Sequence, residues 1–438
     1  MAGMETTETK KPKILIFTMT SWNSKVGANT WESLVNRYNS EDLANIFLRE
    51  ETPDSKVCSK YFCISENRVI KSILKRKIKT GREVEVKPLV EVEDSEDLQA
   101  HNERYAKMKK KRRYSMLLAR ELCWKFGKWK TKELDAFLDE FKPDVILHGM
   151  DGYIHMNRIV RYAIKHTGAK AIGYIWDDNF TYKQSKKFGY KVYRYYQRKS
   201  LKKLAKQTDG FFAITPKTKA EADAFFGVNC TVLSKPLNNT PYPTSYENRT
   251  RPIRMLYTGN LLIGRDKSLQ KISAALKALN AEQTKIVLDV YTQTQLSEEY
   301  LQKTTNEFCK IHPPIPQEEV LRLQKETDIL LFLEDMSNEN LTARLSFSTK
   351  ITDYFSAGKC IFAIGNADLA PMQYFADTQS ASIAHSAEEI EMQLEQLTQA
   401  DVLAKYAQNA VACGVENHRA EYIFKAFDDM IERVYKGE

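Results

Sequence analysis

Short apolar runs alternate with longer stretches of helical periodicity along most of this chain, and no other feature limits its possible folds as strongly. In the first half the apolar runs predict strands at 13–19, 144–148, 169–175 and 210–214. Helices are expected to begin near residue 30 and to span 154–166, 182–206 and 216–226. Strands separated by helices of this length predict a mostly parallel sheet with crossover connections.

The same alternation starts again after a polar, irregular stretch between Pro236 and Pro252, which has the composition of a linker. The strands predicted here are 253–257, 285–291, 328–333 and 360–364, with helices from residues 268, 317 and 349 and a helical tail after residue 387. We therefore expect an α/β chain with two doubly wound, Rossmann-like domains facing each other across a cleft. Such sheets bind ligands at the carboxyl ends of their strands.

These patterns divide the 438 residues into five expected segments. Residues 1–12 are polar and expected to be disordered, 13–236 form the first domain, and 237–252 form the linker. Residues 253–415 form the second domain, and 416–438 form a helix that packs back on the first.

Composition indicates in which cellular compartment the chain is expected to work. No stretch approaches the ~18 consecutive apolar residues of a membrane-spanning helix, and the polar start lacks the apolar centre of a secretory signal. The seven cysteines are scattered without a C-x-x-C pair. This pattern favours the reducing cytoplasm and argues against a structural zinc site.

The net charge of +9 is concentrated in the first half. Residues 182–206 contain ten Lys or Arg and no acid, interleaved with six Phe or Tyr residues, and a second basic run spans 107–113. A basic, aromatic surface of this kind suits an anionic membrane leaflet. A solvated charged helix and a nucleic-acid-binding surface are the alternatives. The expected membrane-facing side chains are Lys183, Lys187, Lys191, Arg194, Arg198 and Lys202.

Residues 347–363 form the most informative segment. Ser348 and Thr349 are expected to cap a short helix, whose free N–H groups and dipole suit a phosphate, with Lys350 adding charge. Asp353 lies one turn further along, where it can accept hydrogen bonds from sugar hydroxyls. Gly358 ends the helix before a buried strand. A plain helix–strand unit is the alternative interpretation.

This segment resembles the donor-domain signature of the glycosyltransferase-B superfamily, particularly the retaining sugar-nucleotide group called family 4. The resemblance implies that residues 348–350 contact a nucleotide diphosphate and that Asp353 holds the ribose. Asp353 matches the second acid of the family's Glu-seven-residues-Glu pair, and the first, sugar-contacting acid falls on Leu345 here, so a retaining or an inverting outcome stays open. Three residues of the preceding loop could replace the missing acid: Asn338, Glu339 and Asn340.

The start of the second domain carries another part of the resemblance. A strand that runs into a glycine-bounded loop and then into cations can hold a diphosphate. Residues 255–269 resemble the family's donor loop, with Arg265 in the place of its lysine and Asn260 in that of its arginine. An exposed turn with ordinary surface charge is the alternative. The donor-binding residues expected here are Gly259, Asn260, Arg265 and Lys267.

Two loops of the first domain are candidates for the acceptor side. The loop 18–29 occupies the position at which such enzymes meet the acceptor, with Trp22, Gly27 and Asn29 as the expected contacts. After the strand 169–175 come two acids, Asp177 and Asp178, and the residue before them is a Trp where the family often has a His. Either acid could act as a general base or orient an acceptor hydroxyl.

Together these features predict a hexosyltransferase that moves a sugar from a nucleotide diphosphate donor, by resemblance a UDP-sugar. The expected acceptor is a saccharide or lipid-linked saccharide in cell-surface polysaccharide synthesis, reached from the cytoplasm at the inner face of the membrane. No D-x-D triplet occurs, so the metal-dependent glycosyltransferase-A mechanism is not expected, and neither a metal nor a cofactor is predicted. A sugar-nucleotide epimerase of the same fold is the main alternative. Nucleic-acid binding ranks lower, because no helix-turn-helix, zinc-finger or RNP-type motif occurs.

Overall fold

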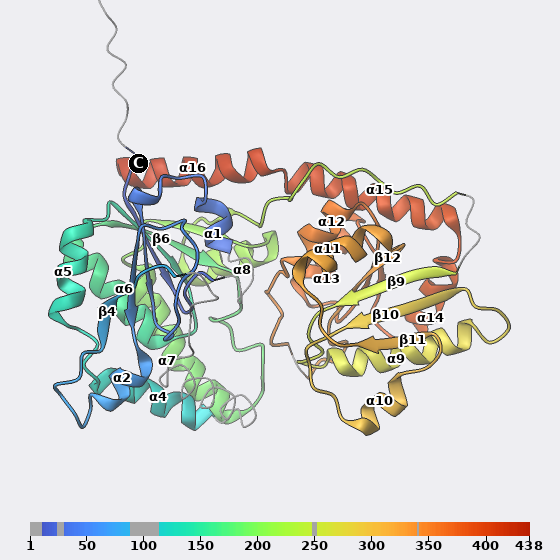
Figure 1. Cartoon of the computed structure of the whole chain (residues 1–438), viewed down its shortest axis with the longest axis horizontal. Coiled ribbons are helices and arrows are strands. Elements are labelled where there is room, and N and C mark those ends of the chain that lie inside the picture. The colour runs from blue at the N-terminus through green and yellow to red at the C-terminus, as the bar shows by residue number, and fades with distance from the viewer. Residues whose placement is uncertain (1–10, 24–29, 88–113, 248–251, 340) are drawn as a thin grey trace, which may run out of the picture.

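The computed structural model describes residues 11–23, 30–87, 114–247, 252–339 and 341–438. Five predictions concern residues outside these ranges: most of the segment 1–12, the basic run 107–113, Gly27, Asn29 and Asn340. The described chain forms two α/β halves, each built on its own sheet (Figure 1). We call residues 11–235 the N-terminal half and residues 252–417 the C-terminal half.

The N-terminal half contains an eight-stranded sheet in the order β4-β3-β2-β1-β5-β6-β7-β8, parallel except where β4 pairs with β3. Its strands are β1 (Ile14–Thr18), β2 (Leu43–Phe47), β3 (Lys60–Ile64), β4 (Gly81–Glu83), β5 (Val145–Gly149), β6 (Lys170–Ile175), β7 (Gly210–Ala213) and β8 (Thr231–Val232). Its helices are α1 (Thr30–Val35), α2 (Glu66–Lys71), α4 (Tyr114–Phe126), α5 (Lys132–Phe141), α6 (Ile154–Thr167), α7 (Phe188–Ala205) and α8 (Pro216–Phe226), with a short 3-10 helix at Ser40–Asp42.

The C-terminal half contains a parallel six-stranded sheet in the order β11-β10-β9-β12-β13-β14. Its strands are β9 (Ile253–Thr258), β10 (Ile286–Tyr291), β11 (Cys309–His312), β12 (Ile329–Leu333), β13 (Cys360–Ile364) and β14 (Ser382–Ala384). Its helices are α9 (Arg265–Leu279), α10 (Glu298–Thr304), α11 (Gln317–Glu326), α12 (Lys350–Ala357), α13 (Ala370–Thr378), α14 (Ala387–Gln396) and α15 (Ala400–Asn417).

The predicted fold class is confirmed, because both halves are doubly wound sheets. In each sheet the strand order reverses once, between β1 and β5 in the first and between β9 and β12 in the second. The loops that follow these strands separate at the reversal and leave a crevice at the carboxyl edge. The topology therefore directs the search for a site to the residues after β1, β5, β9 and β12.

The sequence patterns did not predict strand β2 or the exact start of helix α9, and each has a physical reason. Strand β2 is buried along its whole length but has a polar centre, Asn45, whose amide donates to the Ile16 carbonyl and the Thr18 hydroxyl, both at 3.0 Å. Helix α9 begins three residues before the expected start, because Gly264 adopts a left-handed φ of 86° just ahead of it. Asn45 interrupts the apolar run of β2, and the conformation of Gly264 is not visible in hydrophobic periodicity.

The last helix, α16 (Ala420–Lys436), leaves the C-terminal half and packs against β5 and β6 of the other sheet. Figure 1 shows α15 and α16 end to end along one side of both halves. A side chain on Gly210 in β7 would meet Met430 at 2.6 Å, so the helix lies directly on the sheet. Phe427 stacks on Phe212 with ring centroids 5.8 Å apart and also contacts Trp31.

This packing predicts that α16 belongs to the core of the N-terminal half. Phe427→Ala should lower the free energy of unfolding by about 3–5 kcal/mol, the usual cost of emptying a buried aromatic site. The matched control on the same helix is Tyr422→Ala, whose side chain is 54% exposed and which should change stability by less than about 0.5 kcal/mol. Urea unfolding followed by tryptophan fluorescence measures both. Equal losses would contradict the packing described.

Candidate functional site

Two cavities open between the halves and meet at the start of α12. The larger, of about 890 Å³, is lined by residues after β9, β10 and β11, by α11 and by the start of α12, with Asn23, Glu32 and Asp54 from the N-terminal half. The smaller, of about 370 Å³, is lined by residues after β1, β5 and β6 and by 346–349. Thr349 lines both. The two cavities thus lie at the carboxyl edges that the topology indicates.

The start of α12 lines the larger cavity, and its N-cap residue provides no side-chain cap. The helix begins at Lys350, and the preceding Thr349 has helical backbone angles and makes no side-chain capping hydrogen bond. Ser348 only accepts from the Lys350 N–H, at 3.4 Å. The expectation that both side chains cap the helix is therefore wrong for Thr349. Uncapped first-turn N–H groups carry the partial positive charge that attracts anions.

Lys350 adds a full charge at the same point. Its ammonium lies 5.0 Å from the centre of the Tyr257 ring, and among the described residues no carboxylate forms an ion pair with it. Burial, and after it the charge of Arg265, lowers the pKa of Lys350 to about 8. At neutral pH the cavity thus contains a half-buried cation that forms no ion pair with a described carboxylate, and an anionic ligand would stabilise it.

Gly259 allows Lys350 to reach this position. Its φ of 151° lies in a region that favours glycine, and a Cβ atom there would be 1.9 Å from the Lys350 ammonium nitrogen. Gly259 and Lys350 line the same cavity, together with Asp353. The structure therefore places four of the predicted donor contacts on one cavity: Gly259, Thr349, Lys350 and Asp353.

The other two cations predicted for the donor loop lie differently. Arg265 pairs with Glu334 at 2.6 Å and donates to the Asn260 side chain at 2.8 Å and to the Leu333 carbonyl at 3.1 Å. Neither Arg265 nor Asn260 lines the described cavities. Both instead make contacts that stabilise the loop between β9 and α9. Lys267 is exposed on α9 and also lies outside both linings. Sequence reasoning missed Glu334 because its partner lies 69 positions away.

Asp353 connects α12 to the linker. Its carboxylate accepts from the Lys235 ammonium at 2.7 Å and from the Asn238 amide at 2.9 Å. Lys235 also lines the larger cavity. This end of the cavity is therefore polar on both sides, which is the character expected of a surface that holds hydroxyl groups.

The smaller cavity contains two carboxylates. Asp177 follows β6 and accepts a hydrogen bond from Ser346 of the other half, and Asp151 follows the neighbouring strand β5. Burial raises the pKa of Asp177, and burial together with the Asp177 charge raises the pKa of Asp151 to about 7. Sequence analysis missed Asp151. Its signal was an acid three residues beyond the predicted strand 144–148, between Gly149 and Gly152.

Comparisons with known proteins agree with this architecture. No protein-family model matches the chain, and no curated protein matches its sequence. A sucrose-phosphate synthase from Thermosynechococcus elongatus superposes with a TM-score of 0.63 at 10% identity, over 98% of this chain and 100% of that one. Anabaena Alr3699/HepE, solved in complex with UDP-glucose, gives 0.59 at 10% identity, over 96% and 100%. An α,α-trehalose 6-phosphate synthase from Burkholderia multivorans gives 0.59 at 9%, over 98% and 100%.

This chain has the glycosyltransferase-B fold. At such low identity the likeness shows the fold alone. The chain spans only 60% and 57% of the length of two larger matched chains, in the GtfA/B complex and in TarM, each with a TM-score of 0.50.

In this glycosyltransferase-B fold, Asp178 cannot be the freely available base that the sequence suggested. It is fully buried, and its carboxylate accepts from the Thr181 N–H at 2.9 Å and pairs with Arg344 at 3.1 Å. The same guanidinium binds Glu221 of α8 at 2.6 Å. Asp178 therefore holds the two halves together, and of the two adjacent acids only Asp177 lines a cavity.

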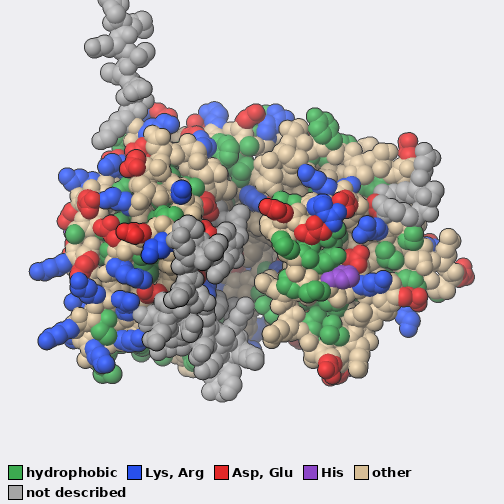
Figure 2. Space-filling view, viewed as in Figure 1, with side chains coloured by type: hydrophobic (Ala, Val, Ile, Leu, Met, Phe, Trp, Pro, Cys, Tyr) green, Lys and Arg blue, Asp and Glu red, His purple; other side chains and the backbone are tan. Residues whose placement is uncertain are grey.

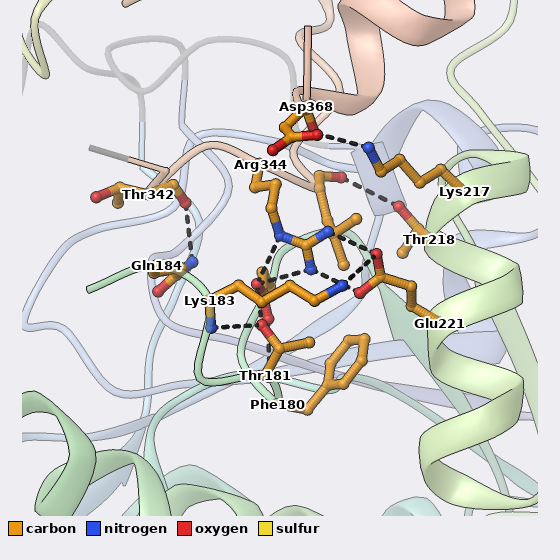
Figure 3. A network of polar contacts seen from close by, with 12 residues as sticks. Phe180, Thr181, Lys183, Gln184, Lys217, Thr218, Glu221, Thr342, Arg344 and Asp368 are labelled. Atoms are coloured by element: carbon orange, nitrogen blue, oxygen red, sulfur yellow. Dashed lines mark hydrogen bonds and ion pairs between the residues drawn. The ribbon is translucent and has the colours of Figure 1, made fainter. Parts of the chain in front are cut away.

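Figure 3 shows the network around Arg344, which we call the Arg344 clamp. Three further hydrogen bonds cross between the halves beside it: Lys217 to the Asp368 carbonyl at 2.7 Å, Thr218 to the Leu345 carbonyl at 3.2 Å, and Gln184 to the Thr342 carbonyl at 2.9 Å. Leu345 itself is fully buried in the core of the N-terminal half. At the position where the family has an acid, this chain therefore has an apolar side chain that is part of the core. The proposed substitutes Asn338 and Glu339 are exposed and line neither cavity.

Two other groups of predicted residues need correction. Trp22 is buried, with its carbonyl accepting from the Asp54 N–H at 3.2 Å, so its side chain does not face an acceptor. In the basic segment Arg194 is buried against Gln184, and Arg198 is half-buried over the Phe225 ring at 4.2 Å. The remaining predicted membrane-facing residues are exposed: Lys183, Lys187, Lys191 and Lys202.

Two searches of the described residues found no candidate. No helix among them is long and apolar enough to cross a membrane. No group of three or more His, Cys, Asp or Glu in that part of the chain could hold a metal ion. Metal independence stays a prediction.

The Arg344 clamp can be tested by removing its cation. Arg344→Met leaves Asp178 buried without a counter-charge, which should cost about 3–5 kcal/mol and separate the halves as the acid gains water. We expect a lower melting temperature and a larger radius of gyration by solution scattering. Arg322→Met, which removes an exposed arginine paired with two acids on α11, should change neither. Identical behaviour of the two variants would refute the clamp.

Proposed function

We propose that this chain is a glycosyltransferase that transfers a sugar from a nucleotide diphosphate to a saccharide or lipid-linked saccharide. The observation that carries the proposal is Lys350, a half-buried cation that pairs with no carboxylate of the described residues and lies at the start of α12, where the N-cap residue provides no side-chain cap. A diphosphate placed there would receive N–H groups, a helix dipole and an ammonium at once. The adjoining cavity with its two carboxylates then provides room for an acceptor.

The nucleoside extends from the diphosphate into the larger cavity. Tyr291 lines that cavity and stacks on His312 with ring centroids 4.7 Å apart, which gives a flat surface against which a base can pack. Asp353 and Lys235 provide the polar end for ribose hydroxyls. Uridine is the proposed base, because Alr3699/HepE was solved with UDP-glucose and one matched synthase from Burkholderia vietnamiensis is described as UDP-forming.

The experiment is a calorimetric titration of the chain with UDP, ADP, GDP and UDP-glucose. We expect base-selective binding, with UDP and UDP-glucose preferred. Gly259→Ala should weaken the UDP affinity at least tenfold, because its Cβ would displace the Lys350 ammonium. The control is Gly227→Ala, which also changes a left-handed glycine but meets no atom within 4 Å. If no nucleotide binds, or if both variants bind like the parent, the proposed donor site is wrong.

The acceptor part of the proposal places the enzyme in the cytoplasm, peripheral on the inner face of the membrane, in cell-surface polysaccharide synthesis. Figure 2 shows Lys and Arg side chains projecting from the outer and lower edge of the N-terminal half. Helix α4 packs against both α2 and α7, and large apolar side chains at or just beyond the ends of these three helices are exposed: Leu74 at 92%, Phe188 at 83% and Phe126 at 56%. Apolar tips within a basic surface suit an anionic bilayer.

The membrane part is tested with liposomes. Replacing four exposed lysines of the basic segment by Gln (Lys186, Lys187, Lys191 and Lys199) should remove about 4 kcal/mol of attraction at low salt, near 1 kcal/mol per residue. Co-sedimentation with phosphatidylserine vesicles should then fall sharply. The control makes the same change at four exposed lysines of the C-terminal half: Lys271, Lys277, Lys303 and Lys325. Equal binding by both variants, or binding that ignores lipid charge, would contradict docking through this face.

A further inference from the structure

We infer that Asp151 is the general base that takes the proton of the acceptor hydroxyl, and that the sugar is transferred in one displacement with inversion at its anomeric carbon. This inference rests on the proposed function. No sequence motif marks Asp151. Asp177 and Ser346 then position the acceptor and take no part in the proton transfer.

The topology places Asp151 in the smaller cavity, which adjoins the larger one at Thr349. Strands β5 and β6 pair in parallel up to Gly149 and Tyr174, so the loops after them leave the sheet side by side. Asp151 and Asp177 stand on these loops and line the smaller cavity, which also includes Thr349 just before the phosphate-binding start of α12. An acceptor in this cavity therefore has the acids on one side and the donor's anomeric carbon on the other.

The surroundings of the two acids separate their roles. Asp177 receives the Ser346 hydroxyl, so one of its oxygens is already hydrogen-bonded across the cleft. Asp151 accepts a hydrogen bond from the Trp176 side chain of its own half, and among the described residues no Lys or Arg lines its cavity. The titratable groups that share this cavity are Asp177 from the loop after β6 and Tyr153 at the start of α6. The Arg344 guanidinium contacts the loop after β6 through Asp178 and is also paired with Glu221.

These surroundings suit a base. Burial and the neighbouring Asp177 charge raise the pKa of Asp151 to about 7. A carboxylate with that pKa accepts a proton near neutral pH far better than an exposed one. The apolar walls of the cavity, which include Phe17, Trp31 and Ile214, exclude water that would otherwise compete for the proton.

The step balances as follows. The acceptor O–H gives its proton to the Asp151 carboxylate while the acceptor oxygen forms a bond to the anomeric carbon from the side opposite the diphosphate. The bond between that carbon and the β-phosphate oxygen breaks, and its electron pair stays on the phosphate. Lys350 and the first N–H groups of α12 stabilise the added negative charge. Asp151 then returns its proton to water.

The test uses the full chain with UDP-glucose and other UDP-sugars, with UDP release as the readout and with water or simple saccharides as the acceptor. Asp151→Asn should lower kcat by about 10²–10⁴-fold and leave the UDP-glucose affinity unchanged. Asp139→Asn, an exposed acid of the same half, is the matched control and should keep full activity. Proton NMR of the first product formed should show a β-glucoside or β-glucose from the α-linked donor.

The pH profile separates a base from a structural acid. In the parent, kcat/KM should rise with pH through about 7 as Asp151 loses its proton. Asp177→Asn removes the neighbouring charge and should move this rise to lower pH, whereas a purely structural role predicts no movement. Retained activity of Asp151→Asn, an α-configured product or an unmoved rise would overturn the assignment while leaving the donor site intact. A parent that releases no UDP from any donor would contradict the proposed function and the base with it.

Discussion

The buried guanidinium of Arg344 is the interaction on which the rest of the structure depends. It comes from the C-terminal half and lies between Asp178 and Glu221 of the N-terminal half. A charge buried in this way is stable only while its partners stay in place, so the contact favours one arrangement of the two sheets. Both cavities exist only in that arrangement, because each takes its walls from both halves.

One loop, between β12 and α12, connects this contact to the chemistry. Glu334 at its start holds Arg265 and through it the donor loop, and Arg344 closes the halves. Leu345 fills the core of the N-terminal half, and Ser346 donates to Asp177. The loop ends at the uncapped start of α12. About fifteen consecutive residues therefore hold the two halves together, provide the hydrogen bond to Asp177 and form the proposed phosphate-binding surface.

Hydrophobic periodicity and turn residues predicted the elements of secondary structure that depend on neighbouring residues in the sequence. The strands around each order reversal and the helix that begins near residue 349 follow from periodicity and glycine placement, and they led to Lys350 and Asp353. Contacts between distant residues could not be predicted in the same way. Nothing in the sequence shows that Arg265 pairs with Glu334, or that Asp178 faces Arg344 while the adjacent Asp177 faces a cavity. Successive residues leaving a strand point to opposite sides, so one position decides between a structural and a functional acid. Asp151 lacked a motif, and only its strand position marks it.

The central claim is that a nucleotide diphosphate binds at the start of α12. The most direct measurement is hydrogen–deuterium exchange of the backbone amides with and without saturating UDP. A diphosphate at this place should slow exchange at 349–353 and 258–260, the two segments that would contact its phosphates. Unchanged exchange in these two segments, with protection appearing elsewhere or nowhere, would contradict the account.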